Sequence, residues 1–242
     1  MPNEWKRSLE EYHYDVSLQH YDNANQYPEW FRGSIPINDR HNTVSFENHF
    51  RQRALTSIEA WLEVVFWKMY SQPNRRNNVT NQVADYFQAN RILPQNLFNA
   101  CDAYIHNDTR DNLNAIRIAL GFTSPAIAVA ATFPAFLRPD LFPMVDTRIA
   151  KWVGQNMDAH NTADPNAPQL VRPRYLDTQA TVLTLTDFDF VFSWTRWCKY
   201  KANQLNALTS IDWRPRDVEM AVFRAWGNRN EPHPMIQLEV LL

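Results

Sequence analysis

The stretch from residue 112 to residue 153 holds the residues whose types and spacing best fit a chemical role. It reads NLNAIRIALGFTSPAIAVAATFPAFLRPDLFPMVDTRIAKWV. The pattern predicts a helix, a short hairpin over residues 121–124, a second helix, a Pro-stiffened connection, and Asp146 at the start of a third helix. Backbone amides at such a hairpin can bind a phosphate. A carboxylate tethered near them can stabilise a developing positive charge.

Simpler roles compete with chemistry for the acidic residues. Asp146 also fits a plain N-cap for a helix over residues 148–156, because aspartate is common at that position. Asp187 and Asp189 fit the start of a later helix in the same way. Glu59 and Glu63 are four residues apart and are predicted to lie on a solvated helix face.

Metal and cofactor chemistry finds little support in the sequence. The nearest histidine pair, His13 and His20, fits two surface side chains better than a metal site. No P-loop, dinucleotide fingerprint, HExxH or GxSxG motif occurs. We therefore expect no cofactor and no bound metal.

Helical periodicity predicts the elements that must position these residues. Apolar residues recur at helical spacing over about residues 44–70, from residue 83, from Pro94, over about 109–120, from about 187, and over 217–226. Gly121 is predicted to end the helix before the hairpin, and Ser124-Pro125 to begin the next. Residues 75–78 are predicted to form a polar loop and residues 157–180 a long, mobile connection. The aromatic-rich residues 1–45 are predicted to pack as an arm on a larger body, and the fold class is all-α.

Composition narrows the class of protein further. The chain has 242 residues, 45% of them hydrophobic, and only 4 glycines, which favours helices over a β-sandwich or a glycine-cradled nucleotide fold. A net charge of −2 indicates no global positive field. The two cysteines, Cys101 and Cys198, exclude a disulfide framework and a four-thiolate iron–sulfur cluster. A charged N-terminus and the lack of an 18-residue apolar run predict a cytoplasmic protein with no membrane partner.

The stretch resembles the helix-hairpin-helix DNA glycosylase superfamily, which includes endonuclease III and the alkylpurine and oxoguanine glycosylases. Three motifs carry the resemblance: Leu120-Gly121-Phe122-Thr123-Ser124 as the hairpin, Ala126-Ile127-Ala128 after it, and Phe142-Pro143-Met144-Val145-Asp146-Thr147-Arg148 as the acidic segment. The resemblance covers about 40 residues. It implies that the amides of Gly121, Phe122, Thr123 and Ser124 bind a DNA phosphate and that Asp146 is catalytic.

Two departures from the family pattern shape the expected activity. Thr123 stands where the family hairpin usually has a second glycine. Bifunctional members carry a lysine nucleophile early on the following helix, where this chain has Ser124-Pro125-Ala126. Without an amine there, a Schiff-base β-lyase step is not expected, and the resemblance implies a monofunctional enzyme acting on a flipped base in double-stranded DNA.

Basic and aromatic residues are candidates for further DNA contacts and for a base pocket. Four cations are candidates for phosphate contacts, although each alone fits a solvated surface charge: Arg148, Lys151, Lys68 and Arg75. Five tryptophans are candidates for a base pocket, although each alone fits the hydrophobic core better: Trp30, Trp61, Trp67, Trp194 and Trp197.

The expected architecture has two helical lobes with a DNA cleft between them. Residues 46–140 form the lobe that ends in the helix-hairpin-helix, and residues 1–45 with 146–242 form the lobe that carries Asp146. The expected function is removal of a damaged or modified base, for repair or for defence against modified bacteriophage DNA, in the cytoplasm or on a bacterial nucleoid. A non-catalytic helix-hairpin-helix DNA-binding protein, and an all-α interaction protein that uses the aromatic arm, are the alternatives. No protein partner is implied.

Overall fold

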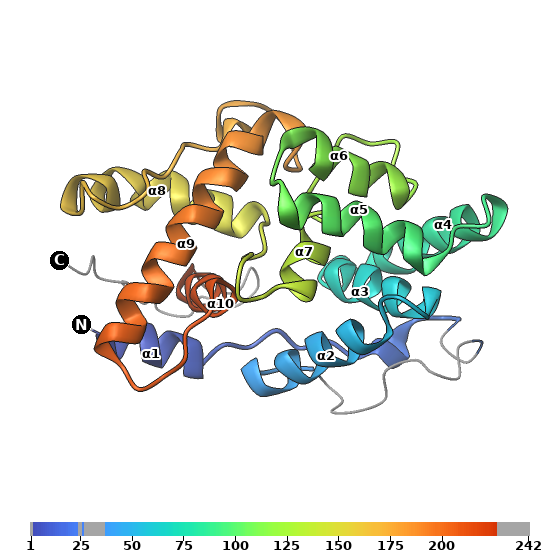
Figure 1. Cartoon of the computed structure of the whole chain (residues 1–242), viewed down its shortest axis with the longest axis horizontal. Coiled ribbons are helices and arrows are strands. Elements are labelled where there is room, and N and C mark those ends of the chain that lie inside the picture. The colour runs from blue at the N-terminus through green and yellow to red at the C-terminus, as the bar shows by residue number, and fades with distance from the viewer. Residues whose placement is uncertain (1, 24–25, 27–36, 227–242) are drawn as a thin grey trace. The chain divides into compact units, whose positions relative to one another are not determined.

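The structure is a computed structural model that describes residues 2–23, 26 and 37–226 (Figure 1). The predicted all-α class is confirmed, because the elements of these residues are helices and no β-strand occurs among them. They fall into two compact units, residues 14–137 and residues 1–13 with 138–242. None of the described helices has the length and apolar character needed to cross a membrane.

The unit of residues 14–137 is built around an aromatic core. Its described elements include the 3-10 helix η1 (Leu18–His20) and the α-helices α2 (Arg40–Arg53), α3 (Ile58–Met69), α4 (Pro73–Ala89), α5 (Pro94–His106), α6 (Arg110–Ala119) and α7 (Thr132–Leu137). Trp61 on α3 stacks on Phe133 of α7 with 4.8 Å between ring centroids. Phe46 of α2 meets Phe136 of α7 edge to face at 5.5 Å. These fully buried rings join α2 and α3 to α7, which is distant from them in sequence.

Polar and proline residues set the helix starts in this unit. The side chains of Asp39, Ser57 and Thr109 accept hydrogen bonds from backbone amides of the first turns of α2, α3 and α6. Pro94 begins α5, as predicted. The polar loop predicted for residues 75–78 is wrong, because these residues lie inside α4. Pro73 pre-sets the backbone of its first turn, and the amides of residues 75 and 76 donate to the carbonyl of Gln72.

The N-terminal segment is divided between the two units. Residues from 14 onward belong with 46–137, whereas the sequence suggested that all of 1–45 would pack with the C-terminal part. Val16 and Ile37 form an isolated antiparallel bridge. The Tyr21 hydroxyl donates to Asn81 Oδ1 on α4 at 2.6 Å. The bridge joins two parts of this segment, and the Tyr21 hydrogen bond attaches the segment to α4.

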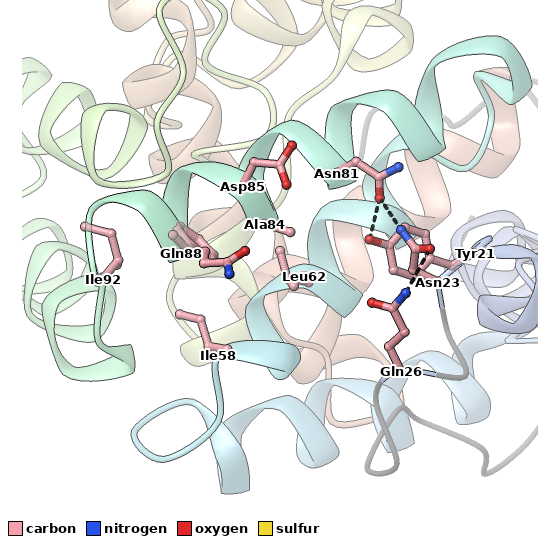
Figure 2. Close-up of a pocket in the computed structure, with 11 residues that line it drawn as sticks. Tyr21, Asn23, Gln26, Ile58, Leu62, Asn81, Ala84, Asp85, Gln88 and Ile92 are labelled. Carbon is pink, nitrogen blue, oxygen red and sulfur yellow. Dashed lines mark hydrogen bonds between the residues drawn. The ribbon is translucent and has the colours of Figure 1, made fainter.

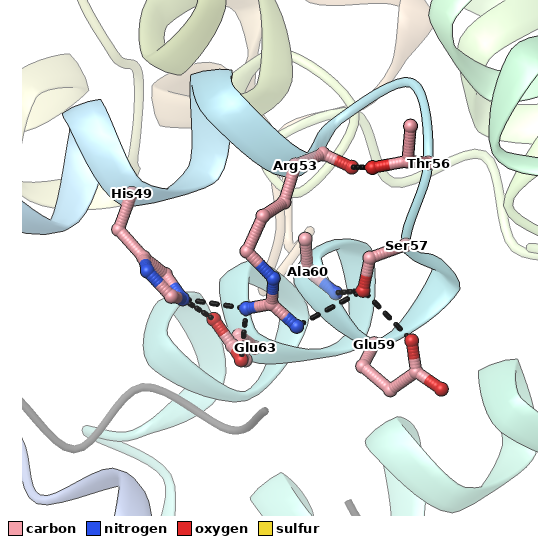
Figure 3. Close-up of polar contacts among 7 residues, drawn as sticks. All are labelled: His49, Arg53, Thr56, Ser57, Glu59, Ala60 and Glu63. Atoms are coloured by element: carbon pink, nitrogen blue, oxygen red, sulfur yellow. Dashed lines mark hydrogen bonds and ion pairs between the residues drawn. The ribbon is translucent and has the colours of Figure 1, made fainter. Parts of the chain in front are cut away.

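A buried ion pair joins α2 to α3 (Figure 3). Glu63 was predicted to lie on a solvated face, and this is wrong, because its side chain is fully buried. Its Oε1 accepts from Arg53 Nη1 at 2.8 Å, and its Oε2 lies 3.2 Å from His49 Nε2. A carboxylate can be buried at this depth because the Arg53 guanidinium and the His49 ring replace the water it loses.

Replacing Glu63 with Gln is expected to lower the free energy of unfolding by about 2 kcal/mol. The amide removes the counter-charge of the Arg53 guanidinium, and hydrogen bonds to charged groups contribute about 1.5–3 kcal/mol. Urea denaturation would compare it with Glu59→Gln on the same helix. Glu59 is more exposed and accepts from Ser57 Oγ at 2.7 Å, so that change should cost less than about 1 kcal/mol. Equal losses in the two variants would contradict the importance of the buried pair.

The described part of the second unit packs α-helices around a tryptophan-rich core. It contains α1 (Pro2–Glu10), α8 (Thr147–Ala163), η3 (Arg174–Asp177), η4 (Leu185–Asp187), α9 (Phe188–Leu208) and α10 (Pro215–Trp226). Helix α1 packs against α10, where Ser8 Oγ donates to the Ala221 carbonyl at 2.6 Å. The predicted stop of the last helix at Gly227 lies outside the described residues.

The connection after α8 begins later than predicted and is held by a buried carboxylate. Helix α8 continues to Ala163, beyond the predicted end at residue 156. The buried carboxylate of Asp187 then binds two separate backbone amides, that of Tyr175 at 2.7 Å and that of Thr184 at 2.9 Å. Asp187 therefore holds the connection before α9, but the predicted side-chain cap is wrong, because its carboxylate makes no capping hydrogen bond to α9.

Two titratable side chains lie among the tryptophans. His160 on α8 and Lys201 on α9 are both buried. Burial, and secondly the positive charge of Lys201, lowers the pKa of His160 to about 4. Burial lowers the pKa of Lys201 to about 8, although Asp164 opposes the shift. The Lys201 ammonium lies 5.7 Å from the ring centre of Trp5 and 5.6 Å from that of Trp197.

The His160 shift predicts a loss of stability in mild acid. The unfolded chain takes up a proton as the pH falls below about 6.5, whereas the folded chain takes it up only near pH 4, so folding becomes less favourable between these values. We expect a loss of about 2 kcal/mol between about pH 7.5 and pH 5. Urea denaturation of the wild type and of His160→Phe would measure it. An unchanged pH dependence in the variant would contradict this assignment.

Candidate functional site

The hairpin after α6 is closed by a C-terminal cap that only glycine fits. The Gly121 amide donates to the Ile118 carbonyl at 2.9 Å, and the Phe122 amide donates to the Arg117 carbonyl at 3.2 Å. This pair of bonds is the Schellman motif, whose extra residue adopts a left-handed conformation. Gly121 has φ +79°, and a Cβ there would lie 2.4 Å from Cγ of Tyr86 on α4. The prediction that Gly121 ends this helix is confirmed.

Arg117 fixes the path of the hairpin after this cap. Its Nε donates to Asn114 Oδ1 at 2.8 Å, and its Nη1 donates to the carbonyls of Phe122 and Ser124, the latter at 2.9 Å. The Arg117 guanidinium therefore binds two hairpin carbonyls and holds them at the end of α6. Arg117 was not among the predicted site residues. A basic residue in the last helical turn was the available signal, because such side chains commonly bind free carbonyls there.

The helix predicted to start at Ser124-Pro125 is wrong. Residues 127–131 form a turn in which the Ala131 amide donates to the Ile127 carbonyl, and α7 begins only at Thr132. Arg117 instead binds the carbonyls of Phe122 and Ser124, and the chain over residues 124–126 follows a non-helical path.

The hairpin leaves backbone donors available on its outer side. Thr123 and Ser124 are exposed. Within the described ranges, neither of their amides donates to a protein acceptor. Two neighbouring backbone amides of this kind can bind an anionic oxygen. The amides of Gly121 and Phe122 were also predicted to bind a phosphate, but both donate within the helix cap, which leaves the Thr123 and Ser124 amides for an anion.

Asp146 lies at the N-terminus of α8, as predicted. Its Oδ1 accepts from the amides of Arg148 at 2.8 Å and Ile149 at 2.9 Å. Among the described residues these are the hydrogen bonds to the carboxylate, so Oδ2 keeps its capacity to accept or to face a cation. The side chain is half-buried.

The segment before Asp146 is rigidly held. Residues 142–145 are buried, and Trp194 Nε1 on α9 donates to the Met144 carbonyl at 3.0 Å. The hydrogen bonds of Asp146 to α8 and of Met144 to Trp194 on α9 therefore fix the position of the carboxylate within its unit. Chemistry at a carboxylate depends on such fixed placement.

The candidate cations differ in their surroundings. The guanidinium of Arg148 lies 4.6 Å from the ring centre of Phe223, and Lys151 is exposed one turn further along α8. Lys68 lies on α3 and is half-buried. Arg75 lies on α4, is exposed, and donates to Gln72 Oε1 at 3.1 Å. Of the four, Arg148 and Lys151 share a helix start with Asp146.

The candidate tryptophans serve the core. Trp61, Trp67, Trp194 and Trp197 are each at most 2% exposed, so they fit the core role that the sequence favoured. Trp30 lies outside the described residues. No cluster of three metal-ligating His, Cys, Asp or Glu side chains forms in the described part of the chain.

Comparison of the chain with protein-family models, with curated proteins and with solved structures gives no match. Functional assignment therefore depends on the chemistry of the hairpin and of Asp146.

Proposed function

We propose that the protein is a monofunctional DNA glycosylase that hydrolyses the N-glycosidic bond of a flipped damaged or modified base. The main support for this proposal is the half-buried carboxylate of Asp146. One of its oxygens is held by two backbone amides, and the other oxygen can still accept a hydrogen bond or face a cation. The exposed hairpin amides of Thr123 and Ser124 supply the DNA phosphate contact in this proposal.

The chemistry follows from charge development. Breaking the bond between base and sugar builds positive charge on the deoxyribose, and a fixed carboxylate stabilises that charge. Asp146 Oδ2 would face this cation, or hold the attacking water, while Oδ1 remains bound to α8. Because the target atom is hidden inside a duplex, the base must first be flipped out of the stack.

The product expected from these residues is an abasic site with an intact strand. A β-lyase step needs an amine that attacks the sugar. No lysine occurs between Lys68 and Lys151, so the hairpin and the chain up to Asp146 supply none. The modified base would be a repair substrate or a base of bacteriophage DNA.

A panel of duplexes tests the proposal. Each would carry uracil, an oxidised base, an alkylated base or a glucosylated pyrimidine, and abasic sites would be revealed by alkali. Formation of alkali-sensitive sites on one of these duplexes supports the proposal and names the substrate class. Absence of sites on every duplex contradicts it.

One observation favours a second function, non-catalytic DNA binding. The two bonds to α8 amides would by themselves account for an aspartate at position 146. Salt-sensitive binding to unmodified duplex without release of any base would support this alternative.

A further inference from the structure

A cavity of about 450 Å³ lies in the 14–137 unit and has no part in the proposed chemistry (Figure 2). Eleven described residues line it: Tyr21, Asn23, Gln26, Ile58, Leu62, Asn81, Ala84, Asp85, Phe87, Gln88 and Ile92. Its size falls within the range of small-molecule sites, which is about 300–1,000 Å³.

The walls of this cavity differ in chemistry. Ile58 and Leu62 of α3 lie one turn apart and form an apolar side, with Ile92 at one end. Helix α4 provides carboxamide and carboxylate side chains opposite them, Asn81 and Gln88 among these. An apolar wall facing a few polar groups is the usual composition of a site that binds and orients a small organic molecule.

The polar groups are partly fixed in orientation. Asn81 Oδ1 accepts from the Tyr21 hydroxyl at 2.6 Å and from Asn23 Nδ2 at 3.0 Å, and Gln26 Nε2 donates to Asn23 Oδ1 at 3.4 Å. With its oxygen occupied by two donors, the Asn81 amide keeps its NH₂ group for another acceptor. Figure 2 shows this nitrogen turned away from Tyr21 and Asn23.

Gln88 offers a complete carboxamide. Its side chain is exposed, and in the described part of the chain no hydrogen bond engages it. Figure 2 shows its amide directed toward the side of the cavity where Leu62 and Ile58 lie. A carboxamide presents a donor beside an acceptor, and this pairs with a base edge that presents the opposite arrangement.

The charge of the lining selects against anions. Asp85 is the one charged side chain among the described lining residues, and it is acidic. A phosphate here would meet a like charge and no cation. The ligand class that fits is therefore an uncharged, partly apolar nitrogen heterocycle.

We propose that this cavity is a binding site for a nucleobase or nucleoside. The Gln88 carboxamide would form a donor and an acceptor hydrogen bond with the edge of the base, and the apolar side chains of α3 would pack on one face of its ring. The site lies wholly within residues 14–137, so the proposal stands independently of the glycosylase reaction.

Calorimetric titration of the full chain with adenosine and with cytidine tests this site. We expect saturable binding of at least one nucleoside with a Kd below about 1 mM. Its 5′-monophosphate should bind at least about threefold more weakly at low salt, because of Asp85. No saturation by either nucleoside up to about 5 mM, or tighter binding of the monophosphate, would overturn the proposal.

Matched variants locate the binding. Gln88→Ala should weaken it about tenfold, and Ile58→Trp should abolish it by filling the cavity. Gln82→Ala, an exposed glutamine of the same helix outside the lining, should change it less than about twofold. Wild-type affinity in Gln88→Ala and Ile58→Trp would overturn the proposal. So would loss of nucleoside binding in Asp146→Asn with Gln88→Ala unaffected, because the nucleoside would then occupy the glycosylase site.

Discussion

Replacing Gly121 with Ala is expected to lower the free energy of unfolding by about 2–4 kcal/mol. The left-handed backbone, φ +79°, costs a residue with a Cβ about 1–2 kcal/mol. The new Cβ would also lie 2.4 Å from Cγ of Tyr86, an atom one bond beyond that side chain's own Cβ. The ring cannot move from this position without a shift of α4 or a new rotamer, and such overpacking costs about 1–3 kcal/mol.

Gly154→Ala provides a matched control for this prediction. Gly154 lies within α8 and has no left-handed backbone, and its new Cβ would meet the terminal methyl Cδ1 of Leu176, which can rotate away. In a helix interior, alanine is also more stable than glycine by about 1 kcal/mol, which offsets part of any loss. We expect a change within about 1 kcal/mol in urea denaturation. A Gly121→Ala variant as stable as Gly154→Ala would show that the hairpin does not depend on its glycine.

Replacing Asp146 with Asn is expected to reduce base release at least about 100-fold while the fold is retained. The asparagine Oδ1 can still accept from the amides of Arg148 and Ile149, so the α8 cap survives. What disappears is the negative charge, and loss of one group that stabilises the transition state costs about 10²–10³ in rate. The free energy of unfolding should fall by less than about 1 kcal/mol, from the weakened interaction with the helix dipole.

Two further variants separate catalysis from capping. Asp146→Ala removes the cap and the charge together, so it should lose activity and also about 1 kcal/mol of stability. Asp39→Asn changes another aspartate N-cap, that of α2, whose side chain accepts from the Asn42 amide at 2.7 Å. It should leave base release unchanged. Equal release by wild type and Asp146→Asn would exclude Asp146 as the catalytic residue.

Most helices of this protein could be predicted because their signals are local. Pro94, Thr109 and Gly121 act on their own turn, and the apolar spacing of α3 and α6 needs no tertiary information. The α8 cap by Asp146 was predicted for the same reason.

The failures have tertiary causes. Ser124-Pro125 has the residues of a helix start, but the Arg117 side chain from α6 binds the hairpin carbonyls and the chain there is not helical. Glu63 looked solvated because its partners, Arg53 and His49, lie on another helix. The cavity lined by Gln88 and Asn81 joins the segment after η1 to α3 and α4, and no spacing within one segment reveals it.

The most direct test of the central claim is a single-turnover reaction in which free base and strand breaks are measured together on the duplex panel. The account predicts that the wild type releases a free base in step with abasic sites, that the strand stays intact until alkali is added, and that Asp146→Asn binds the duplex but releases almost nothing. Binding without release by the wild type, or strand cleavage without alkali, would contradict a monofunctional glycosylase that acts through Asp146.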